Sequence, residues 1–308
     1  MAATAPSASA YPMANSVMHI LITGGAGQVG TELQRAAWPD NVRLHAPSRA
    51  ELDLTNPTAL ARAFDATPFA AVINPAAYTA VDKAEDEVAE AFAANGMGPA
   101  LLADATRKAG IPLIHVSTDY VFDGSGEDAY VESDPVAPLG VYGASKLAGE
   151  LAVRAGNPRS VVLRTAWVFS AHRNNFVKTM LRIGAINPVV KVVADQHGSP
   201  TSAADIASAL MTITLRLLDD EAAPTGVYQF VNAGDASWHG FANEIFAAAA
   251  PESAPQVISI TTAEYPTKAR RPANSRLSTD KLTRDFGIRP RPWSQALGDV
   301  IAELKRGA

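Results

Sequence analysis

A glycine-rich turn between an apolar run and a helix-like segment constrains this chain more than any other feature. The run MHILITG (residues 18–24) leads into QVGTELQRAAW (residues 28–38), whose apolar positions recur at helical spacing. Gly24, Gly27 and Gly30 give the spacing G-x-x-G-x-x-G across this junction. In a strand–turn–helix unit such glycines tighten the turn and let the backbone approach a pyrophosphate, which the N–H groups at the helix start can bind. The segment therefore predicts a dinucleotide site, with a tight turn that binds nothing as the alternative.

Strand and helix patterns then alternate as far as about residue 195. Parallel strands joined by right-handed crossovers carry helices on both faces, so the alternation predicts an α/β fold, a Rossmann-type doubly wound parallel sheet. The segments expected after the first pair are VRLHA (42–46), NPTALARAF (56–64), FAAVINPAA (69–77), a long helix over about 85–108, IPLIHVSTD (111–119), a helix over about 142–154, SVVLRTAWVF (160–169) and NNFVKTMLRIGA (174–185).

Beyond about residue 195 this rhythm breaks. We expect residues 18–195 to form the main part of an NAD(P)-binding Rossmann domain, and residues 196–308 to form mainly a smaller C-terminal substrate-binding lobe packed on it. Residues 1–17, rich in alanine, serine and proline, are expected to form a flexible leader. The segments expected in the second region are a helix over 203–218, a strand over 226–234 and short helices near 238–249, 278–286 and 293–304.

Composition excludes several classes of protein. With 26 Lys+Arg against 31 Asp+Glu the net charge is -5, the wrong sign for a dedicated binder of nucleic acid or anionic membrane. The chain has no cysteine, which excludes disulfides, thiolate metal sites and cysteine nucleophiles. No apolar run approaches the ~20 residues of a membrane helix, and the N-terminal segment does not resemble a secretory signal. We therefore expect a cytoplasmic protein.

The end of the second expected strand indicates which nucleotide the site prefers. NAD sites usually place an acidic residue there to bind the ribose hydroxyls, but this strand runs into Pro47, Ser48 and Arg49. A basic residue suits a 2′-phosphate, so we expect NADPH, with NADH as a weaker possibility and a solvated arginine as the alternative reading. Asp53 and Leu54 resemble the Asp-apolar pair that brackets an adenine in such sites.

A tyrosine and a lysine stand four residues apart in YGASK, at the start of an expected helix. Tyr142 and Lys146 would leave the same helix face, and an ammonium close to a phenol lowers the phenol's pKa. The lysine can also bind the ribose hydroxyls of a cofactor. Both follow the strand that ends in Ser117-Thr118-Asp119, whose hydroxyls would lie at the carboxyl edge of the sheet. For the pair alone, a chance spacing on an exposed helix is the alternative.

The glycine turn, Thr118, Tyr142 and Lys146 together resemble the short-chain dehydrogenases/reductases, in particular the extended branch that acts on nucleotide sugars. Blocks occurring in order from Met18 to the C-terminus resemble the dTDP-4-dehydrorhamnose reductase family, and several blocks at compatible spacing are more specific than one motif. These blocks are GGAGQVG, NPAAYTAVDKAE, STDYVFDG, YGASKLAGE, RTAWVFS, VVADQHGSPTSAADIA and RRPANSRLS.

The resemblance implies that NADPH reduces the C4 ketone of dTDP-4-dehydro-L-rhamnose to dTDP-L-rhamnose. The alternatives are a related nucleotide-sugar 4-ketoreductase and a non-catalytic regulatory subunit that binds the cofactor. Arg270 and Arg271 would bind the nucleotide diphosphate or lie on a solvated face. The implied roles are Gly27, Gln28 and Val29 at the pyrophosphate, Asp53 and Leu54 at the adenine, Ala77, Tyr78 and Thr79 along the cofactor cleft, Thr118, Asp119 and Trp167 at the sugar, Tyr142 as proton donor and Lys146 as its partner.

The sequence departs from the family pattern at the residues that would bind a metal. Relatives that form a magnesium-bridged homodimer use glutamates, and Glu32 is present, but Ala203 and Ala204 stand where a second glutamate is expected. The six histidines show no close-spaced pair of metal-ligand type. We therefore expect no catalytic metal, regard magnesium as doubtful, and leave a homodimer as an open expectation.

Overall fold

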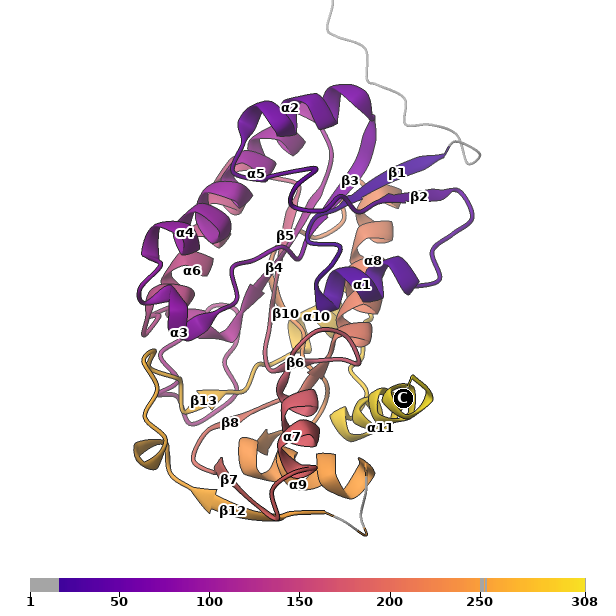
Figure 1. Cartoon of the computed structure of the whole chain (residues 1–308). Coiled ribbons are helices and arrows are strands. Elements are labelled where there is room, and N and C mark those ends of the chain that lie inside the picture. Colours follow the sequence, from indigo (N-terminus) through magenta and orange to yellow (C-terminus); the bar gives the residue numbers. More distant parts are fainter. Residues whose placement is uncertain (1–16, 250–251, 253, 308) are drawn as a thin grey trace, which may run out of the picture.

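Six parallel strands form the central sheet, in the order β10-β5-β4-β3-β1-β2 (Figure 1). The computed structural model describes residues 17–249, 252 and 254–307, so the expected leader, apart from Val17, lies outside the described residues. The predicted Rossmann-type α/β fold is confirmed. The strands are β1 Met18–Ile22, β2 Val42–His45, β3 Phe69–Asn74, β4 Leu113–Thr118, β5 Ser160–Thr165 and β10 Gly226–Gln229.

Side chains of these strands alternate between two hydrophobic cores, one on each face of the sheet. Ile22 and Ile73 pack with α1 and α8, whereas their neighbours Leu21 and Val72 pack with α2, α5 and α6. Because both faces are covered, the strands are apolar on both sides, as their sequences predict. The helices are α1 Gln28–Arg35, α2 Pro57–Ala66, α5 Gly98–Ala109, α6 Val141–Gly156 and α8 Ala203–Asp219.

The long helix expected over about residues 85–108 is interrupted. Its place is taken by α3 (Val81–Ala84), α4 (Val88–Phe92), the π-helix η1 (Ala93–Met97) and then α5. In η1 the Asn95 side chain accepts from Tyr78 N at 2.8 Å and donates to Tyr78 O at 3.0 Å. The wider π-turn therefore fastens the helix to the loop that follows β3.

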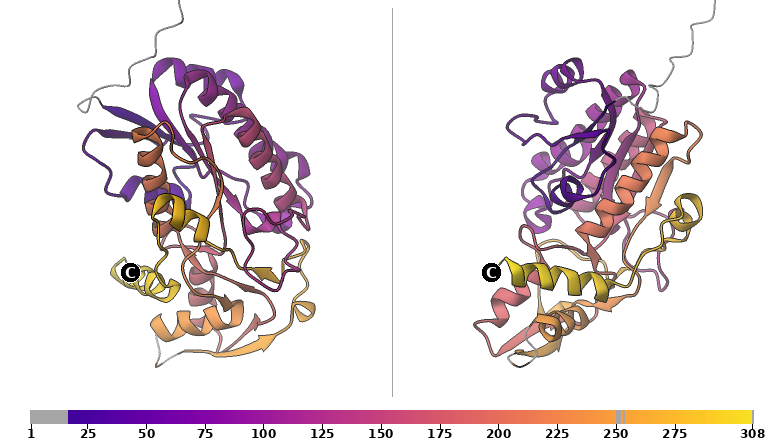
Figure 2. Two further views of the ribbon diagram at one scale, coloured as in Figure 1. Left: turned by 180° about the vertical axis from the view of Figure 1, so that it is seen from behind. Right: turned by 90° about the vertical axis from the view of Figure 1, so that its right-hand side faces the viewer.

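A smaller part lies below the sheet in Figure 1 and is seen from two further sides in Figure 2. Its own apolar core is built from α7, α9, α11 and the strands beside them. The parallel pair of β7 and β12 was not expected from the sequence. The remaining elements are η2 Asp119–Val121, β6 Val168–Phe169, α7 Phe176–Gly184, β7 Val189–Val193, β8 His197–Gly198, β9 Thr201–Ser202, β11 Ala236–Ser237, α9 Trp238–Ala249, β12 Gln256–Ile260, η4 Thr262–Glu264, β13 Asn274–Ser275, α10 Asp280–Phe286 and α11 Trp293–Arg306.

The expected division at residue 195 does not match this arrangement. β6, α7 and β7 precede that residue but belong to the smaller part. β10 and α8 follow it, but β10 is a strand of the sheet and α8 packs on the sheet. The reason is that β10 pairs with β5, a strand far earlier in the chain, and such a pairing leaves no local signal in the sequence. The chain therefore crosses between the two parts more than once.

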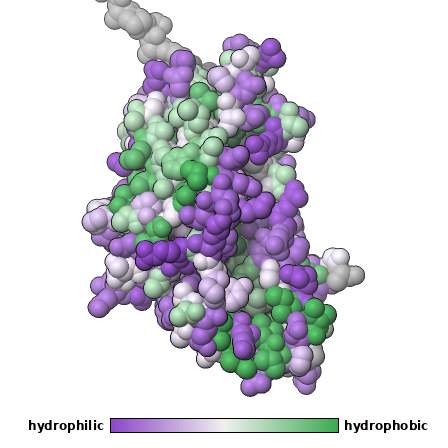
Figure 3. All heavy atoms as spheres, turned by 60° about the vertical axis from the view of Figure 1, so that its left-hand side comes forward, coloured by the Kyte–Doolittle hydropathy of each residue, from purple (hydrophilic) through white to green (hydrophobic). Residues whose placement is uncertain are grey.

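The surface carries apolar side chains on α4, η1 and α6, on the side that Figure 3 turns toward the viewer. The most exposed of them are Met97 and Leu151, each 56% exposed. Among the described helices, none combines the length and the hydropathy that a membrane crossing requires.

Candidate active site

The glycine turn lies between β1 and α1 and has the shape that a pyrophosphate requires. Gly24 has φ +62°, and a Cβ on Gly30 would lie 2.3 Å from Gly24 O, so a side chain at Gly30 would not fit. Gly27 is the N-cap of α1 and has no side chain to cap the helix. The N–H groups of the first turn of α1 are therefore left for an anion, and the turn fits a dinucleotide cofactor.

A cavity of about 820 Å³ begins at this turn and extends between the sheet and the smaller part. Most of the predicted site residues line it, whereas Tyr78, Arg270 and Arg271 are not among its lining residues. Those that do are Gly24, Gly27, Gln28, Val29, Gly30, Arg49, Asp53, Leu54, Ala77, Thr79, Thr118, Asp119, Tyr142, Lys146 and Trp167.

Tyr78 does not line the cavity, and its place in the cofactor cleft stays a prediction. Its phenol donates to Glu87 Oε2 at 2.5 Å, and its backbone is held by Asn95 of η1. The hydrogen bond to a carboxylate outside the cavity turns the ring away from the cleft, while Ala77 and Thr79 on either side face it.

Tyr142 and Lys146 lie on the same face of α6, as their spacing predicts, but their electrostatics differ from expectation. Lys146 Nζ donates to Val116 O at 2.7 Å, and burial lowers the pKa of this lysine to about 8, against the opposing charge of Glu150. Burial raises the pKa of Tyr142 to about 12. The expected lowering of the tyrosine pKa is therefore wrong for this structure, because removing the phenolate from water outweighs the hydrogen bond with Thr118, and the charge of Asp119 adds to the rise.

Thr118 and Asp119 lie at the carboxyl end of β4, next to Tyr142. Thr118 Oγ1 donates to Asp119 Oδ1 at 3.0 Å and accepts from Tyr120 N at 3.2 Å. Burial raises the pKa of Asp119 to about 6, although hydrogen bonds from Ser275 and Thr118 oppose this. Asp119 Oδ2 is buried without a hydrogen-bond partner among the described residues. This end of the cavity therefore holds polar groups that a substrate can bind.

Trp167 faces the cavity from the loop between β5 and β6, and the sequence did not reveal its partner. The ring lies flat on that of Trp238, the first residue of α9, and Phe176 of α7 packs on the other edge of Trp238. Trp238 and Phe176 also line the cavity. The indole pair therefore forms an apolar wall of the cavity that the polar groups of β4 also line.

The far end of the cavity holds the residues assigned to the adenine and its ribose. Arg49, Asp53 and Leu54 line it together, after β2. Asp53 Oδ1 accepts from Thr55 N at 2.9 Å and from Thr55 Oγ1 at 2.8 Å, and these bonds hold the pKa of Asp53 below its usual value. The Asp53 carboxylate thus remains charged and fixed, close to Arg49.

Arg271 is engaged in an ion pair, and neither Arg270 nor Arg271 is among the residues that line the cavity. Its guanidinium binds Asp82 of α3 through two contacts, NH1 to Oδ1 at 3.1 Å and NH2 to Oδ2 at 2.8 Å. Ala269 N donates to the same carboxylate at 3.0 Å, and Lys268 pairs with Asp86. Arg271 therefore ties the C-terminal segment to the loop after β3 instead of reaching the cavity.

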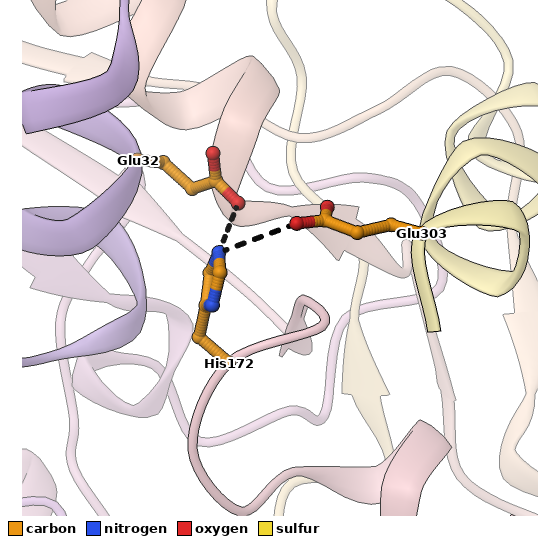
Figure 4. A group of neighbouring side chains, drawn as sticks. All are labelled: Glu32, His172 and Glu303. Carbon is orange, nitrogen blue, oxygen red and sulfur yellow. Dashed lines mark ion pairs between the residues drawn. The ribbon is translucent and has the colours of Figure 1, made fainter. Parts of the chain in front are cut away.

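His172 lies between Glu32 and Glu303 and pairs with both carboxylates, a group that the sequence did not reveal (Figure 4). Ligand atoms of the three lie within 4.8 Å of one another, and His172 Nε2 is 3.1 Å from Glu32 Oε1. Arg35 occupies the same place, with NH1 2.6 Å from Glu303 Oε1 and 2.5 Å from His172 Nε2. Magnesium prefers oxygen ligands, so a set that includes an imidazole and a guanidinium fits it poorly. We read the group as an ion-pair cluster between α1 and α11.

The glycine turn, the cavity and the Tyr142–Lys146 pair define an oxidoreductase of the extended short-chain dehydrogenase/reductase class. The family model described as "RmlD substrate binding domain" matches residues 18–306. A curated dTDP-4-dehydrorhamnose reductase from Sinorhizobium fredii is 47% identical over 291 residues, which are 93% of this chain and 98% of the relative. The chain therefore belongs to the dTDP-4-dehydrorhamnose reductase family.

Solved structures agree with this assignment. A dTDP-4-dehydrorhamnose reductase from Clostridium acetobutylicum superposes with a TM-score of 0.88 at 38% identity, covering 94% of this chain and 100% of that chain. Another, from Bacillus anthracis and in complex with NADP, gives a TM-score of 0.86 at 34% identity, covering 93% of this chain and 99% of that chain.

Proposed function

We propose that the chain reduces the C4 ketone of dTDP-4-dehydro-L-rhamnose to dTDP-L-rhamnose with NADPH, a step toward cell-surface polysaccharide. The observation that carries the proposal is family membership over nearly the whole chain. The cavity supports it, because the dinucleotide turn, Thr118, Tyr142 and Lys146 meet there. The enzyme is an NADP-dependent oxidoreductase.

Tyr142 is the proton donor in this proposal. When bound, NADPH supplies the hydride that the C4 carbon accepts. Negative charge then develops on the C4 oxygen, to which Tyr142 Oη donates its proton to give the alcohol. A pKa of about 12 keeps this phenol protonated at neutral pH. General-acid assistance of this kind contributes about 10²–10⁴-fold in rate.

Other residues orient the substrate and balance charge. Lys146, on the same face of α6, can balance the charge of the phenolate that remains after proton transfer. The Thr118 hydroxyl, next to Tyr142, must turn from Asp119 to donate to the substrate oxygen. Trp167 and Trp238 offer the sugar a flat apolar surface.

The test is NADPH oxidation with the dTDP-4-keto sugar, followed by NMR of the product. We expect dTDP-L-rhamnose. A product with the other configuration at C4, or another sugar, would favour a related 4-ketoreductase, and bound cofactor without turnover would favour a regulatory subunit. A cytoplasmic location and a homodimer remain proposals, the second open to light scattering.

A further inference from the structure

An arginine from the smaller part lies against the glycine turn. Arg173, in the loop between β6 and α7, donates through Nε to Ala26 O at 2.5 Å, and Ala26 lies between Gly24 and Gly27. Arg173 lines the cavity beside Gly27 and Gln28. Of its nitrogens, Nε alone has a hydrogen-bond partner among the described residues, so both terminal nitrogens of the planar fork are left for another acceptor.

The loop that carries Arg173 is fastened to the start of α1. Gln28 Oε1 accepts from Ser170 Oγ at 2.8 Å and from Asn175 Nδ2 at 3.0 Å. Asn175 Nδ2 also donates to Ser170 O at 2.8 Å, which closes the loop on itself. Arg173 is therefore held in place by contacts of its neighbours and does not depend on its own side chain for position.

The backbone at Arg173 is strained. Its φ is +56°, in the left-handed region that glycine adopts freely and that an arginine adopts at a cost. The contact of Nε with Ala26 O uses one of the three guanidinium nitrogens and leaves the two terminal ones unused. A strained residue that faces a binding cavity points to a function for its side chain.

Charge indicates which part of the cofactor this side chain meets. The cations that line the cavity are Arg49, Lys146 and Arg173. Arg49 lies at the adenine end near Asp53, and Lys146 donates to a carbonyl of β4, so Arg173 is the cation beside the glycine turn. A pyrophosphate on the N-terminus of α1 carries two negative charges, and a guanidinium binds phosphate oxygens through paired hydrogen bonds.

We propose that Arg173 binds the pyrophosphate of the cofactor, reaching across from the smaller part to the glycine turn of the sheet. The proposal rests on the proposed function, since it takes NADPH as the cofactor.

Dissociation constants of the full chain for NADPH and NADH, measured by calorimetry, test the contact. Arg173→Gly removes the guanidinium and also relieves the backbone, so a loss of affinity cannot come from new strain. We expect both cofactors to bind about 10- to 100-fold more weakly, since hydrogen bonds to charged groups have this strength. The affinity of Arg173→Lys for both cofactors should lie between the affinities of the unmutated chain and of Arg173→Gly. Arg182→Ala on α7 makes the same change of charge at an exposed residue that is not among the described lining residues, and should bind as the unmutated chain does.

Cofactor fragments identify the phosphate that is bound. ADP carries a pyrophosphate and 2′-AMP carries the 2′-phosphate, so Arg173→Gly should weaken ADP and leave 2′-AMP unchanged. Unchanged or tighter binding of NADPH by Arg173→Gly, or weakening of 2′-AMP alone, would overturn the proposal. If the unmutated chain binds NADPH but does not reduce the sugar, the proposed function fails, while the binding comparison still decides the role of Arg173.

Discussion

Trp167 and Trp238 are stacked with their ring centroids 3.5 Å apart and their planes 9° apart. Trp167 reaches this position because its φ is +49°, and Gly198 leaves room for it, since a Cβ there would lie 2.6 Å from the Trp167 ring. One ring comes from the loop after β5 and the other from the start of α9, so the pair spans both parts of the molecule.

The stacked pair predicts a change in substrate affinity. Trp238→Ala removes one ring and leaves Trp167 without its support, so KM for the nucleotide sugar should rise by about 3- to 10-fold, the range expected for one aromatic contact. The dissociation constant of NADPH should not change, because the pair is assigned to the sugar. Trp238→Phe keeps a ring in place and serves as the control. An equal loss in cofactor affinity would contradict the assignment of this wall to the sugar.

Tyr142→Phe removes the hydroxyl that is proposed to donate the proton and keeps the aromatic ring. We expect kcat to fall by at least ~10²-fold while the dissociation constant of NADPH stays the same, as for an interaction made mainly in the transition state. Steady-state kinetics and a binding titration check the two quantities. Lys146→Met should lower both turnover and cofactor affinity. This double effect distinguishes the role of Lys146 from that of Tyr142, whose loss should lower turnover alone. Near-normal turnover of Tyr142→Phe would show that Tyr142 is not the proton donor.

Arg49→Ala should reduce the preference for NADPH over NADH. A charge-assisted contact to the 2′-phosphate contributes about 1.5–3 kcal/mol, so NADPH should bind at least ~10-fold more weakly while NADH is unaffected. The ratio of kcat/KM for the two cofactors measures this, with Arg62→Ala on the exposed side of α2 as the matched control. Equal use of both cofactors by the unmutated enzyme would be incompatible with the prediction.

Asp119 should make stability depend on pH. The residue is 3% exposed and the pKa of its carboxyl is raised to about 6, compared with about 3.9 for an unfolded chain. Between about pH 3.9 and about pH 6 the carboxyl of Asp119 is protonated in the folded chain and ionised in the unfolded chain. The stability that Asp119 contributes is therefore fully present at pH values below about 3.9 and is lost as the pH rises through about 6. Asp119→Asn cannot titrate. The free energy of unfolding of the unmutated chain minus that of Asp119→Asn should fall by about 2–3 kcal/mol between about pH 4 and pH 7, measured by urea unfolding. A difference that does not vary with pH would contradict the buried state of this carboxyl.

Removal of divalent cations should leave the enzyme unchanged. Glu32 and Glu303 already contact Arg35, and Ala203 and Ala204 add no carboxylate. A chelator should therefore alter neither NADPH-dependent activity nor the oligomeric state seen by light scattering. Dissociation on chelation, reversed by added magnesium, would show that the ion-pair cluster gives way to a metal.

The sequence by itself determined the features that depend on neighbours along the chain. The strand, turn and helix around Gly24, Gly27 and Gly30 follow from local spacing, and so does the shared helix face of Tyr142 and Lys146. The alternation of apolar strands and amphipathic helices was enough to predict the parallel sheet, because its covered faces impose a pattern on each strand separately.

Only the tertiary structure decided which distant residues meet. It turned Tyr78 toward Glu87, paired Arg271 with Asp82 and carried Arg173 and Trp238 into the cavity. It also reversed the expected shift in the pKa of Tyr142, because a pKa depends on burial and on the direction of neighbouring charges. The physical reason is common to these cases: a contact between segments far apart in the chain is set by how the sheet and the smaller part pack, and residue spacing along the chain does not encode that distance.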